Sequence, residues 1–561
     1  MKTPSSILLH TLAGYLLCSP LPAAVVEVSM TTNPETFEFR GDAKDDHLGN
    51  ASAQASQSIA TGDLNGDGLA DIVIGSEDEG TLGAVHITWG RASWASSAAA
   101  MASIADVKIA GVSGEKISSA VAVGDVNGDG VGDLLIGSRN ADPGSLSNSG
   151  AVYVFFGAGS WSSTRTLASA DVKISGNTAG GAWGYSLTAA DVNGDGIGDV
   201  IASAPGQDVS TLTNNGQVAV FFGTTSWTSS IALASANVLI DGPRNSSALA
   251  THLWSGDFND DGISDLFFGS YHDDDPTHTT AGYSGVIWGL FGRTTASWSS
   301  SFIATSANVD FYFAGTSSMY GIAYRGACGD VNGDGAADLI SMASESATTY
   351  TMIWLGGGTA SGAGDNIIDH LISYGNPNNN NGIPSALAVD DFDADGLDDI
   401  AVGFGTSSPG GSLFAGCVTL HYGRSDWDAD EADDVKYTGE VAGDYLGMAV
   451  AMGDTDGDGT ADLLFNTPYF DVSSTKTSAG KVYLIAGTPA EEPAMTFSMT
   501  GSTITLGTSG RSGRTCRLEF STDLSTWTEV ATWNTDGSDY EYNATASGSG
   551  GFYRIVENPQ D

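Results

Sequence analysis

The chain has 561 residues and carries 67 acidic against 20 basic side chains, which gives a formal net charge of −47. This excess of carboxylates argues against nucleic-acid binding, because Lys and Arg are needed to neutralise phosphates. The length is sufficient for two or more domains, and after the N-terminal region no stretch is long and apolar enough to span a bilayer.

Residues 1–24 have the pattern of a secretory signal peptide. Lys2 precedes an apolar run from Ile7 to Cys18, and a Pro/Ala-rich end offers cleavage near Ala23 or Ala24. We therefore expect a secreted or cell-surface protein. After cleavage an odd number of widely spaced cysteines remains, which favours free thiols over a disulfide framework; these are Cys328, Cys417 and Cys516.

An Asp-rich motif of nine residues occurs seven times along the chain, at intervals of 61 to 73 residues. The copy DVNGDGVGD, which begins at Asp125, shows the pattern: Asp at positions 1, 5 and 9, Asn or Asp at position 3, and Gly at position 6. So regular a period indicates a repeat architecture. The other copies begin at Asp63, Asp191, Asp257, Asp330, Asp391 and Asp454.

The composition of these loops predicts calcium sites, up to seven of them. Ca²⁺ takes six to eight oxygen ligands at about 2.3–2.6 Å, whereas Mg²⁺ keeps more of its waters and requires stricter octahedral geometry. The glycine at position 6 allows the sharp turn that such a loop needs. Side chains at positions 1, 3, 5 and 9 and the backbone carbonyl at position 7 are the predicted ligands.

The predicted side-chain ligands are Asp63, Asn65, Asp67 and Asp71; Asp125, Asn127, Asp129 and Asp133; Asp191, Asn193, Asp195 and Asp199; Asp257, Asn259, Asp261 and Asp265; Asp330, Asn332, Asp334 and Asp338; Asp391, Asp393, Asp395 and Asp399; and Asp454, Asp456, Asp458 and Asp462. The predicted carbonyl ligands belong to Leu69, Val131, Ile197, Ile263, Ala336, Leu397 and Thr460.

An EF-hand shares the first half of this motif but also requires a Glu at position 12 and helices on both sides. Position 12 is instead Ile74, Ile136, Ala202 or Phe268 in the first four loops, and the flanking segments have strand-like composition. We therefore reject the EF-hand interpretation.

Between successive loops, four short runs rich in Val, Ile, Phe and Tyr recur, each bounded by Gly or Asp. Four strands repeated seven times predict an all-β fold, a seven-bladed β-propeller. The last blade ends near residue 487 without a fourth strand, while the chain begins with a surplus strand at 36–40. We predict that this N-terminal strand completes the seventh blade and leaves no open sheet edge.

Several phrases of the sequence resemble the FG-GAP repeats of the integrin α-subunit propeller, which also occur in secreted bacterial proteins. They are Leu446-Gly447, Trp183-Gly184-Tyr185-Ser186 and the Asp-x-Asn-Gly-Asp-Gly loops. The resemblance covers about residues 35–487 and implies a propeller domain at 25–487. It also implies that the calcium loops lie between the first and second strands of each blade, all on one face. Asp260 and Ala394 depart from the family's glycine at position 4.

Beyond the propeller, residues 488–494 have the composition of a linker. Residues 495–561 alternate between apolar and polar side chains, as in the strands of a small β-sandwich. We therefore predict a separate C-terminal β module.

Two groups of residues are candidate ligand contacts on the face opposite the metal loops. The first lies in an acidic loop that would hold a cation or polar ligand, although a solvated loop is the alternative; it contains Tyr271, His272, Asp273 and His278. The second has residue types that anchor interfaces and places a partner over blades four to six; it contains Tyr320, Tyr324 and Arg325.

Five tryptophans follow the third strand of their repeats, and we predict that they pack one blade against the next instead of binding sugars. They are Trp94, Trp161, Trp227, Trp298 and Trp427.

The sequence contains no Gly-x-Ser-x-Gly, His-Glu-x-x-His or phosphate-binding loop motif. The favoured hypothesis is therefore a secreted, calcium-stabilised propeller that binds an extracellular protein or glycan without catalysing a reaction. Two alternatives stay open: an extracellular polysaccharide lyase or hydrolase, and an architectural component of a cell surface or matrix.

Overall fold

The structure is a computed structural model. It describes residues 26–30, 36–50, 57–94, 97–117, 120–270, 285–314, 322–323, 325–345, 348–357, 370–374, 384–424, 427, 434–439 and 441–489, and six further strands between residues 495 and 559. Residues 1–25, which include the predicted signal peptide, lie outside this set.

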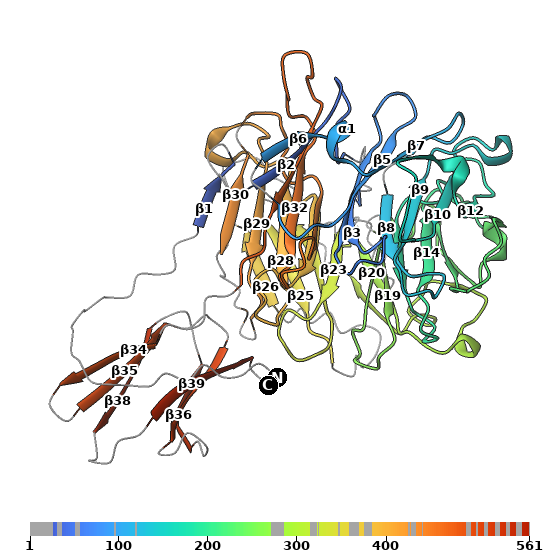
Figure 1. The fold of residues 1–561 in the computed structure, drawn as a ribbon. Coiled ribbons are helices and arrows are strands. Elements are labelled where there is room, and N and C mark those ends of the chain that lie inside the picture. The colour runs from blue at the N-terminus through green and yellow to red at the C-terminus, as the bar shows by residue number, and fades with distance from the viewer. Residues whose placement is uncertain are drawn as a thin grey trace.

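Seven sheets form the blades of a β-propeller (Figure 1), and in each of them the four main strands pair antiparallel in a meander. Blade 1 contains β3 (Ile59–Gly62), β4 (Asp71–Ser76), β5 (Ala84–Thr88) and β7 (Val107–Ala110). Blade 2 contains β8 (Ala120–Gly124), β9 (Asp133–Ser138), β10 (Ala151–Phe155) and β12 (Val172–Ser175). Blade 3 contains β13 (Leu187–Ala190), β14 (Asp199–Ala204), β15 (Gln217–Phe221) and β17 (Val238–Asp241). Blade 4 contains β18 (His252–Gly256), β19 (Asp265–Ser270), β20 (Val286–Leu290) and β22 (Phe311–Ala314).

Blade 5 contains β23 (Gly326–Gly329), β24 (Asp338–Glu345), β25 (Thr348–Trp354) and β26 (His370–Tyr374). Blade 6 contains β27 (Ala386–Asp390), β28 (Asp399–Phe404), β29 (Cys417–His421) and β30 (Val435–Thr438). Blade 7 contains β31 (Val450–Gly453), β32 (Asp462–Thr467), β33 (Lys481–Ile485) and β2 (Thr36–Arg40). The helical segments of the described chain are short: α1 (Met101–Ile104) and single 3₁₀ turns at Pro143–Ser145, Leu167–Ser169, Leu233–Ser235, Thr295–Ser297 and Pro409–Gly411. The predicted all-β, seven-bladed fold is confirmed.

The first strands of the blades surround the axis, and each contacts the first strand of the next blade in cyclic order. Small residues make this possible. A Cβ atom added to Gly124 of β8 would lie 2.6 Å from the Cβ atom of Ala189 in β13. The Ala-, Val- and Gly-rich composition of these strands therefore fits the most crowded position of the ring.

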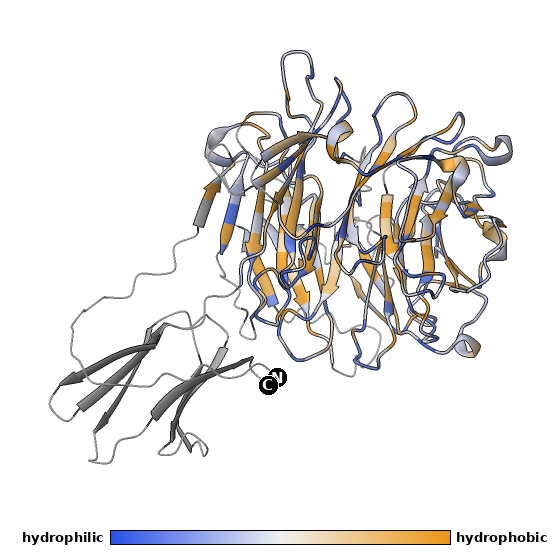
Figure 2. Ribbon diagram, in the orientation of Figure 1, coloured by the Kyte–Doolittle hydropathy of each residue, from blue (hydrophilic) through white to orange (hydrophobic). Residues whose placement is uncertain are grey.

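Hydrophobic residues are frequent along the strands of the blades (Figure 2). Their side chains form clusters that join neighbouring blades. Leu420 and Tyr437 of blade 6, for example, share one cluster with Leu463 and Phe465 of blade 7. The second strands are buried along their whole length in six of the blades. The hydrophobic effect thus holds each blade against its neighbours.

The N-terminal segment closes the ring. β2 pairs antiparallel with β33, with Thr36 opposite Ile485 and Arg40 opposite Lys481. This is the pairing expected from the surplus N-terminal strand. β1 (Val26–Ser29) adds a second link, because it pairs parallel with β30 on the outer edge of blade 6.

Four blades gain a fifth strand that the sequence analysis did not predict. The segment between the third and fourth strands of one blade reaches back to the outer edge of the preceding blade and pairs there in parallel. The strands are β6 (Ser97–Ala100) on β2, β11 (Thr164–Thr166) on β7, β16 (Ser230–Ala232) on β12 and β21 (Ser301–Ile303) on β17. These strands cover sheet edges that would otherwise expose unpaired backbone groups.

The C-terminal region forms two three-stranded antiparallel sheets. One contains β34 (Met495–Thr500), β35 (Thr503–Ser509) and β38 (Asp539–Thr545), and the other β36 (Arg514–Ser521), β37 (Thr528–Asn534) and β39 (Phe552–Pro559). Within the described parts of the whole chain, no helix has the length and hydrophobicity to cross a membrane.

The closing strand yields a stability prediction. Phe39 of β2 is fully buried in the cluster that joins blades 7 and 1. Replacing it with Ala should lower the free energy of unfolding by about 3–5 kcal/mol, because the change removes buried apolar surface and leaves a cavity. Phe39→Leu, which retains most of the volume, serves as the control in chemical denaturation. A loss of under about 1 kcal/mol for Phe39→Ala would show that β2 does not support the ring.

Candidate metal centres

Each Asp-rich loop lies in the hairpin between the first and second strands of its blade. In blade 2, Gly124 at the end of β8 pairs with Asp133 at the start of β9, and the loop spans the residues between them. The remaining six loops occupy the equivalent hairpins. This is the location that the FG-GAP resemblance implies.

The aspartate at position 1 organises the turn. Asp125 Oδ1 accepts hydrogen bonds from the backbone N–H groups of Gly128 at 2.6 Å and Asp129 at 3.2 Å. In all seven loops Oδ2 of this aspartate accepts the N–H of the position 6 glycine, at 2.7 to 3.0 Å. That glycine has a positive φ, 86° for Gly130, which favours a residue without a side chain.

The aspartate at position 9 is fully buried in every loop. Its Oδ2 accepts the position 2 N–H at 2.8 to 3.0 Å. Its Oδ1 accepts the N–H of a glycine after the third strand, at 2.7 to 3.0 Å. The carboxylate therefore joins the loop to the third strand of its own blade. Because an ionised carboxylate has about four lone-pair sites, it retains capacity for a cation.

Burial raises the pKa of these position 9 carboxyl groups well above the ordinary value of 3.8, and other carboxylates of the same loops add to the shift. The pKa is raised to about 7 for Asp71, Asp133, Asp199 and Asp265, and to about 8 for Asp338. Hydrogen bonds from the backbone oppose this shift without cancelling it. Each loop thus places one carboxyl group out of contact with solvent, beside further carboxylates.

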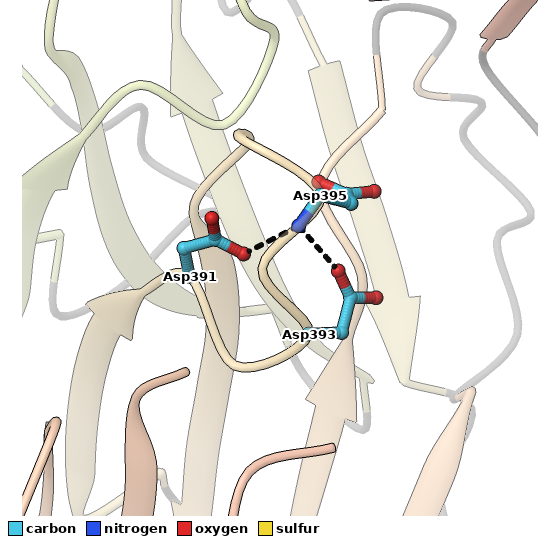
Figure 3. Close-up of side chains that lie close together, drawn as sticks. All are labelled: Asp391, Asp393 and Asp395. Carbon is cyan, nitrogen blue, oxygen red and sulfur yellow. Dashed lines mark hydrogen bonds between the residues drawn. The ribbon is translucent and has the colours of Figure 1, made fainter. Parts of the chain in front are cut away.

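The donor set and its spacing fit a hard divalent cation. In blade 6, Asp391, Asp393 and Asp395 bring one carboxylate oxygen each to within 4.8 Å of one another (Figure 3). The blade 7 loop does the same with Asp454, Asp456 and Asp458. The other five loops have Asn at position 3 and supply an amide oxygen in place of the carboxylate.

The seven loops are joined to one another around the whole ring. The position 1 carbonyl of each loop accepts the position 8 N–H of the loop in the next blade, at 2.8 to 3.1 Å. The series runs from Gly132 N–H donating to Asp63 through to Ala70 N–H donating to Asp454, which joins blade 1 back to blade 7. All seven loops therefore share one face of the propeller and form a closed hydrogen-bonded circle.

Packing between neighbouring loops adds to the positive φ of position 4, 76° for Gly128, in favouring glycine there. A Cβ atom added to Gly128 would lie 2.9 Å from Ile197, the position 7 residue of the next loop. Gly194 meets Ile263 in the same way. In the two departures from glycine, Asp260 and Ala394, the next loop has a smaller residue at position 7 than Ile or Leu. These residues are Ala336 and Thr460.

The repeat tryptophans pack against the loops of the preceding blade. Trp227 of blade 3 donates its indole N–H to the carbonyl of Val126 in the blade 2 loop, at 2.8 Å. Trp161, Trp298 and Trp427 make the equivalent bond to position 2 of the preceding loop, and Trp94 bonds to the Thr455 side chain. The predicted packing role is confirmed.

Of the seven predicted ligand contacts on the opposite face, Arg325 is among the described residues. Tyr271, His272, Asp273, His278, Tyr320 and Tyr324 lie outside the described residues. Arg325, predicted from its residue type to anchor an interface, is only 6% exposed. Its Nε donates to the Ser385 carbonyl at 2.6 Å, and its guanidinium also contacts His252 Nε2. It lines an axial cavity of about 250 Å³ and connects blades 4, 5 and 6 from inside the ring.

These features define a seven-bladed β-propeller with an acidic, metal-type loop in the first hairpin of every blade. The FG-GAP repeat family model matches residues 55–88, 118–155, 183–221 and 446–485, which fall in blades 1, 2, 3 and 7. Four of the seven blades thus match FG-GAP repeats, and the ring is similar to an integrin alpha-type propeller.

Curated relatives match parts of the chain. Phosphatidylinositol-glycan-specific phospholipase D of Rattus norvegicus is 32% identical over 158 residues, which cover 26% of this chain and 18% of the relative. Integrin alpha-PS2 of Drosophila melanogaster is 33% identical over 111 residues, which cover 19% of this chain and 7% of the relative. The chain thus spans less than a fifth of the length of these relatives. A solved glycoside hydrolase aligns with 54% of this chain and 96% of its own chain, at 9% sequence identity and a TM-score of 0.12.

The raised pKa values predict how stability depends on pH in metal-free buffer. Because the folded pKa is about 7 for Asp71, Asp133, Asp199 and Asp265 against an ordinary 3.8, the folded protein binds more protons than the unfolded chain between these values. This contribution to stability is complete below about pH 4 and is lost as the pH rises through about 7. We expect the melting temperature in EDTA to fall between about pH 5 and pH 8.

Asp133→Asn is the matched variant, since it removes one titrating group from a fully buried position. Its melting temperature should depend less steeply on pH than that of the wild type. A wild-type melting temperature that rises over this range in EDTA would contradict the raised pKa values.

Proposed function

We propose that this protein is an extracellular, calcium-stabilised propeller that binds a protein or glycan ligand through the face opposite its metal loops. The observation that carries the proposal is the closed circle of seven acidic loops, whose carbonyls and N–H groups bond from blade to blade. Such a circle concentrates carboxylates that a bound divalent cation would neutralise. Calcium would therefore act on the stability of the entire ring.

In each loop the proposed ligands are the side chains at positions 1, 3, 5 and 9 and the carbonyl at position 7. These are hard oxygen donors, and their number suits Ca²⁺ better than Mg²⁺. The position of the loops supports a structural role for the cation, because position 9 is bonded to the third strand and position 1 to the next blade. A cation that holds positions 1 and 9 together would join these two connections.

The similarity to integrin alpha-PS2 and to phosphatidylinositol-glycan-specific phospholipase D supports an extracellular, ligand-binding role. Since the matched segments are a small part of those proteins, their activities are not transferred to this chain. The N-terminal pattern of residues 1–24 is consistent with secretion. The ligand class that we propose is an extracellular protein or glycan.

Calcium removal tests the structural role. If each site binds with a dissociation constant of roughly 0.1 mM, then ~1 mM Ca²⁺ stabilises it by about 1.4 kcal/mol. Seven such sites would contribute ~10 kcal/mol, which is comparable to the total stability of a typical domain. We therefore expect EDTA to lower the melting temperature strongly and Ca²⁺ to restore it.

The double substitution Asp125→Ala and Asp129→Ala removes two proposed ligands of one site. It should lower the number of calcium ions bound per chain by one, measured by calorimetry and metal analysis. Asp106→Ala, outside the loops, serves as the control for the loss of a carboxylate. Melting curves that respond neither to EDTA nor to Ca²⁺ would refute the structural role.

Ligand binding is tested with arrays of glycans and extracellular matrix proteins, probed with calcium and with EDTA, alongside a polysaccharide degradation assay. Calcium-dependent capture without degradation supports the proposal, whereas degradation would favour the lyase or hydrolase alternative. Replacing Tyr320 and Tyr324 with Ala tests the placement of the ligand over blades four to six. Undiminished capture by this folded variant would rule out that placement.

A further inference from the structure

The junction of blades 6 and 7 has large apolar residues where other blades have small or polar ones. Blades 2, 3, 6 and 7 share one backbone link: a residue just before the first strand of the following blade donates its N–H to the carbonyl of a residue just before the third strand. In blade 7 this link joins His47 to Ser478, at 3.1 Å. In blades 2 and 3 the pairs are Ala182 with Asn148 and Ala248 with Asn214, both at 3.1 Å. In blade 6 the same link, at 3.0 Å, joins Tyr445 to Phe414.

The neighbouring positions differ in the same direction. Leu413 occupies the position of Ser147 and Thr213, and Val441 that of Thr178. Tyr469 follows the last loop aspartate of its blade by seven residues, where blades 2, 3 and 6 have Asn, Gly and Thr. We name these five residues the blade 6–7 patch: Leu413, Phe414, Val441, Tyr445 and Tyr469.

The rings of this patch contact one another. Phe414 and Tyr445 stack at a centroid distance of 5.5 Å with an interplanar angle of 3°, and Tyr469 lies 5.2 Å from Tyr445. Phe414 and Tyr445 have positive φ values of 55° and 58°, a conformation that bulky side chains rarely adopt. Large aromatic residues are therefore placed at positions that backbone stability alone would give to Ala or Asn.

The patch is also exposed. Leu413 is 56% exposed, Val441 52% and Tyr469 38%. These are three of the five large apolar side chains with such exposure among the described residues. An exposed apolar cluster on a highly charged protein indicates an interaction surface, and buried Tyr contacts are typical of its energetic centre.

A pocket of about 710 Å³ opens beside the patch. Val441, Tyr445, Tyr469 and Phe470 supply apolar surface, and Asp444 and Asp471 supply carboxylates. Among the described lining residues there is no Lys or Arg. Lys481 lies against the ring of Phe470 with its Nζ atom 3.9 Å from the centroid and is paired with Glu38.

We propose that the blade 6–7 patch binds an extracellular protein partner by accepting one aromatic or aliphatic side chain in this pocket, with a Lys or Arg residue of the partner facing Asp471. The inference rests on the proposed ligand-binding function and specifies its place and partner chemistry. The net charge of −47 attracts a basic partner and accelerates its association. A protein fits better than a saccharide, because exposed Leu413 and Val441 offer no hydrogen-bond partner to sugar hydroxyls.

Labelled peptides test the chemistry directly. The probes are Lys-Lys-Phe-Lys-Lys, the same peptide with Leu or Ser at its centre, and Glu-Glu-Phe-Glu-Glu, titrated against the full-length protein in calcium by fluorescence polarisation. The Phe and Leu peptides should bind at least tenfold more tightly than the Ser and Glu peptides.

The matched variants use residues that other blades already have. Phe414→Asn, Tyr445→Ala and Tyr469→Thr combined should weaken binding of the Phe peptide at least tenfold. Ile303→Ser, which removes a similarly exposed apolar side chain from β21, should leave it unchanged. If the triple variant loses its calcium-dependent melting transition, the surface pair Leu413→Ser and Val441→Thr provides the same comparison.

Equal peptide binding by wild type and variants would overturn the proposal. So would a saccharide that binds the wild type in a glycan array and is lost with the triple variant, because the patch would then be a sugar platform. If the variants instead capture the same extracellular ligand as the wild type, the ligand-binding function stands and only this location fails. Absence of capture by any folded form, together with peptides that do not bind, would reject both.

Discussion

The burial of seven carboxyl groups beside further carboxylates is the constraint on which the rest of this propeller depends. Seven aspartates with no solvent exposure lie at the starts of the second strands, and each is surrounded by further carboxylates of its own loop. Two backbone N–H groups stabilise each of them, yet burial still raises their pKa. Either protons or cations must therefore compensate the charge, and the clustered oxygens in the loops of blades 6 and 7 have the spacing to hold a cation. A protein that folds outside the cell, where calcium is abundant, would satisfy this constraint without protonation.

The effect of one loop extends beyond its blade, because the loops are mechanically joined. Position 1 bonds to the next blade, position 9 to the third strand of its own blade, and the repeat tryptophans pack against the loop of the blade before. The fifth strands also connect each of their blades to the preceding blade, by pairing with its outer strand. A propeller has no single core that spans the ring, so its cooperativity depends on such contacts between neighbours. Charge compensation in one loop should thus also affect the stability of the adjacent blades.

The sequence predicted the blades, the loop locations and the closing strand, since all three follow from a periodic motif and from the count of strands. Asp125 and its equivalents could be found because their spacing repeats. The fifth strands were not predicted, because segments such as 164–166 and 301–303 are only three residues long and differ in sequence. Their backbone hydrogen-bond partners belong to the preceding blade. Arg325 was assigned to an interface from its residue type alone, whereas in the structure its side chain is buried and contacts His252 and Ser385. The blade 6–7 patch was also missed, although comparing Phe414 with Asn148 and Asn214 in the sequence could have revealed it.

The two faces of the ring therefore differ in how strictly their residues repeat from blade to blade. On the face that carries the Asp-rich loops, positions 1, 5, 6 and 9 are the same in every blade, because each loop must meet the same electrostatic and hydrogen-bonding requirements. On the opposite face the backbone links repeat while the side chains differ, as Ala182, Ala248 and Tyr445 show at one position. Where the backbone is held constant by the repeat, a change in side chain cannot be attributed to folding of that link. In a repeat protein of this kind, the positions that depart from their own repeats are the ones to examine for function.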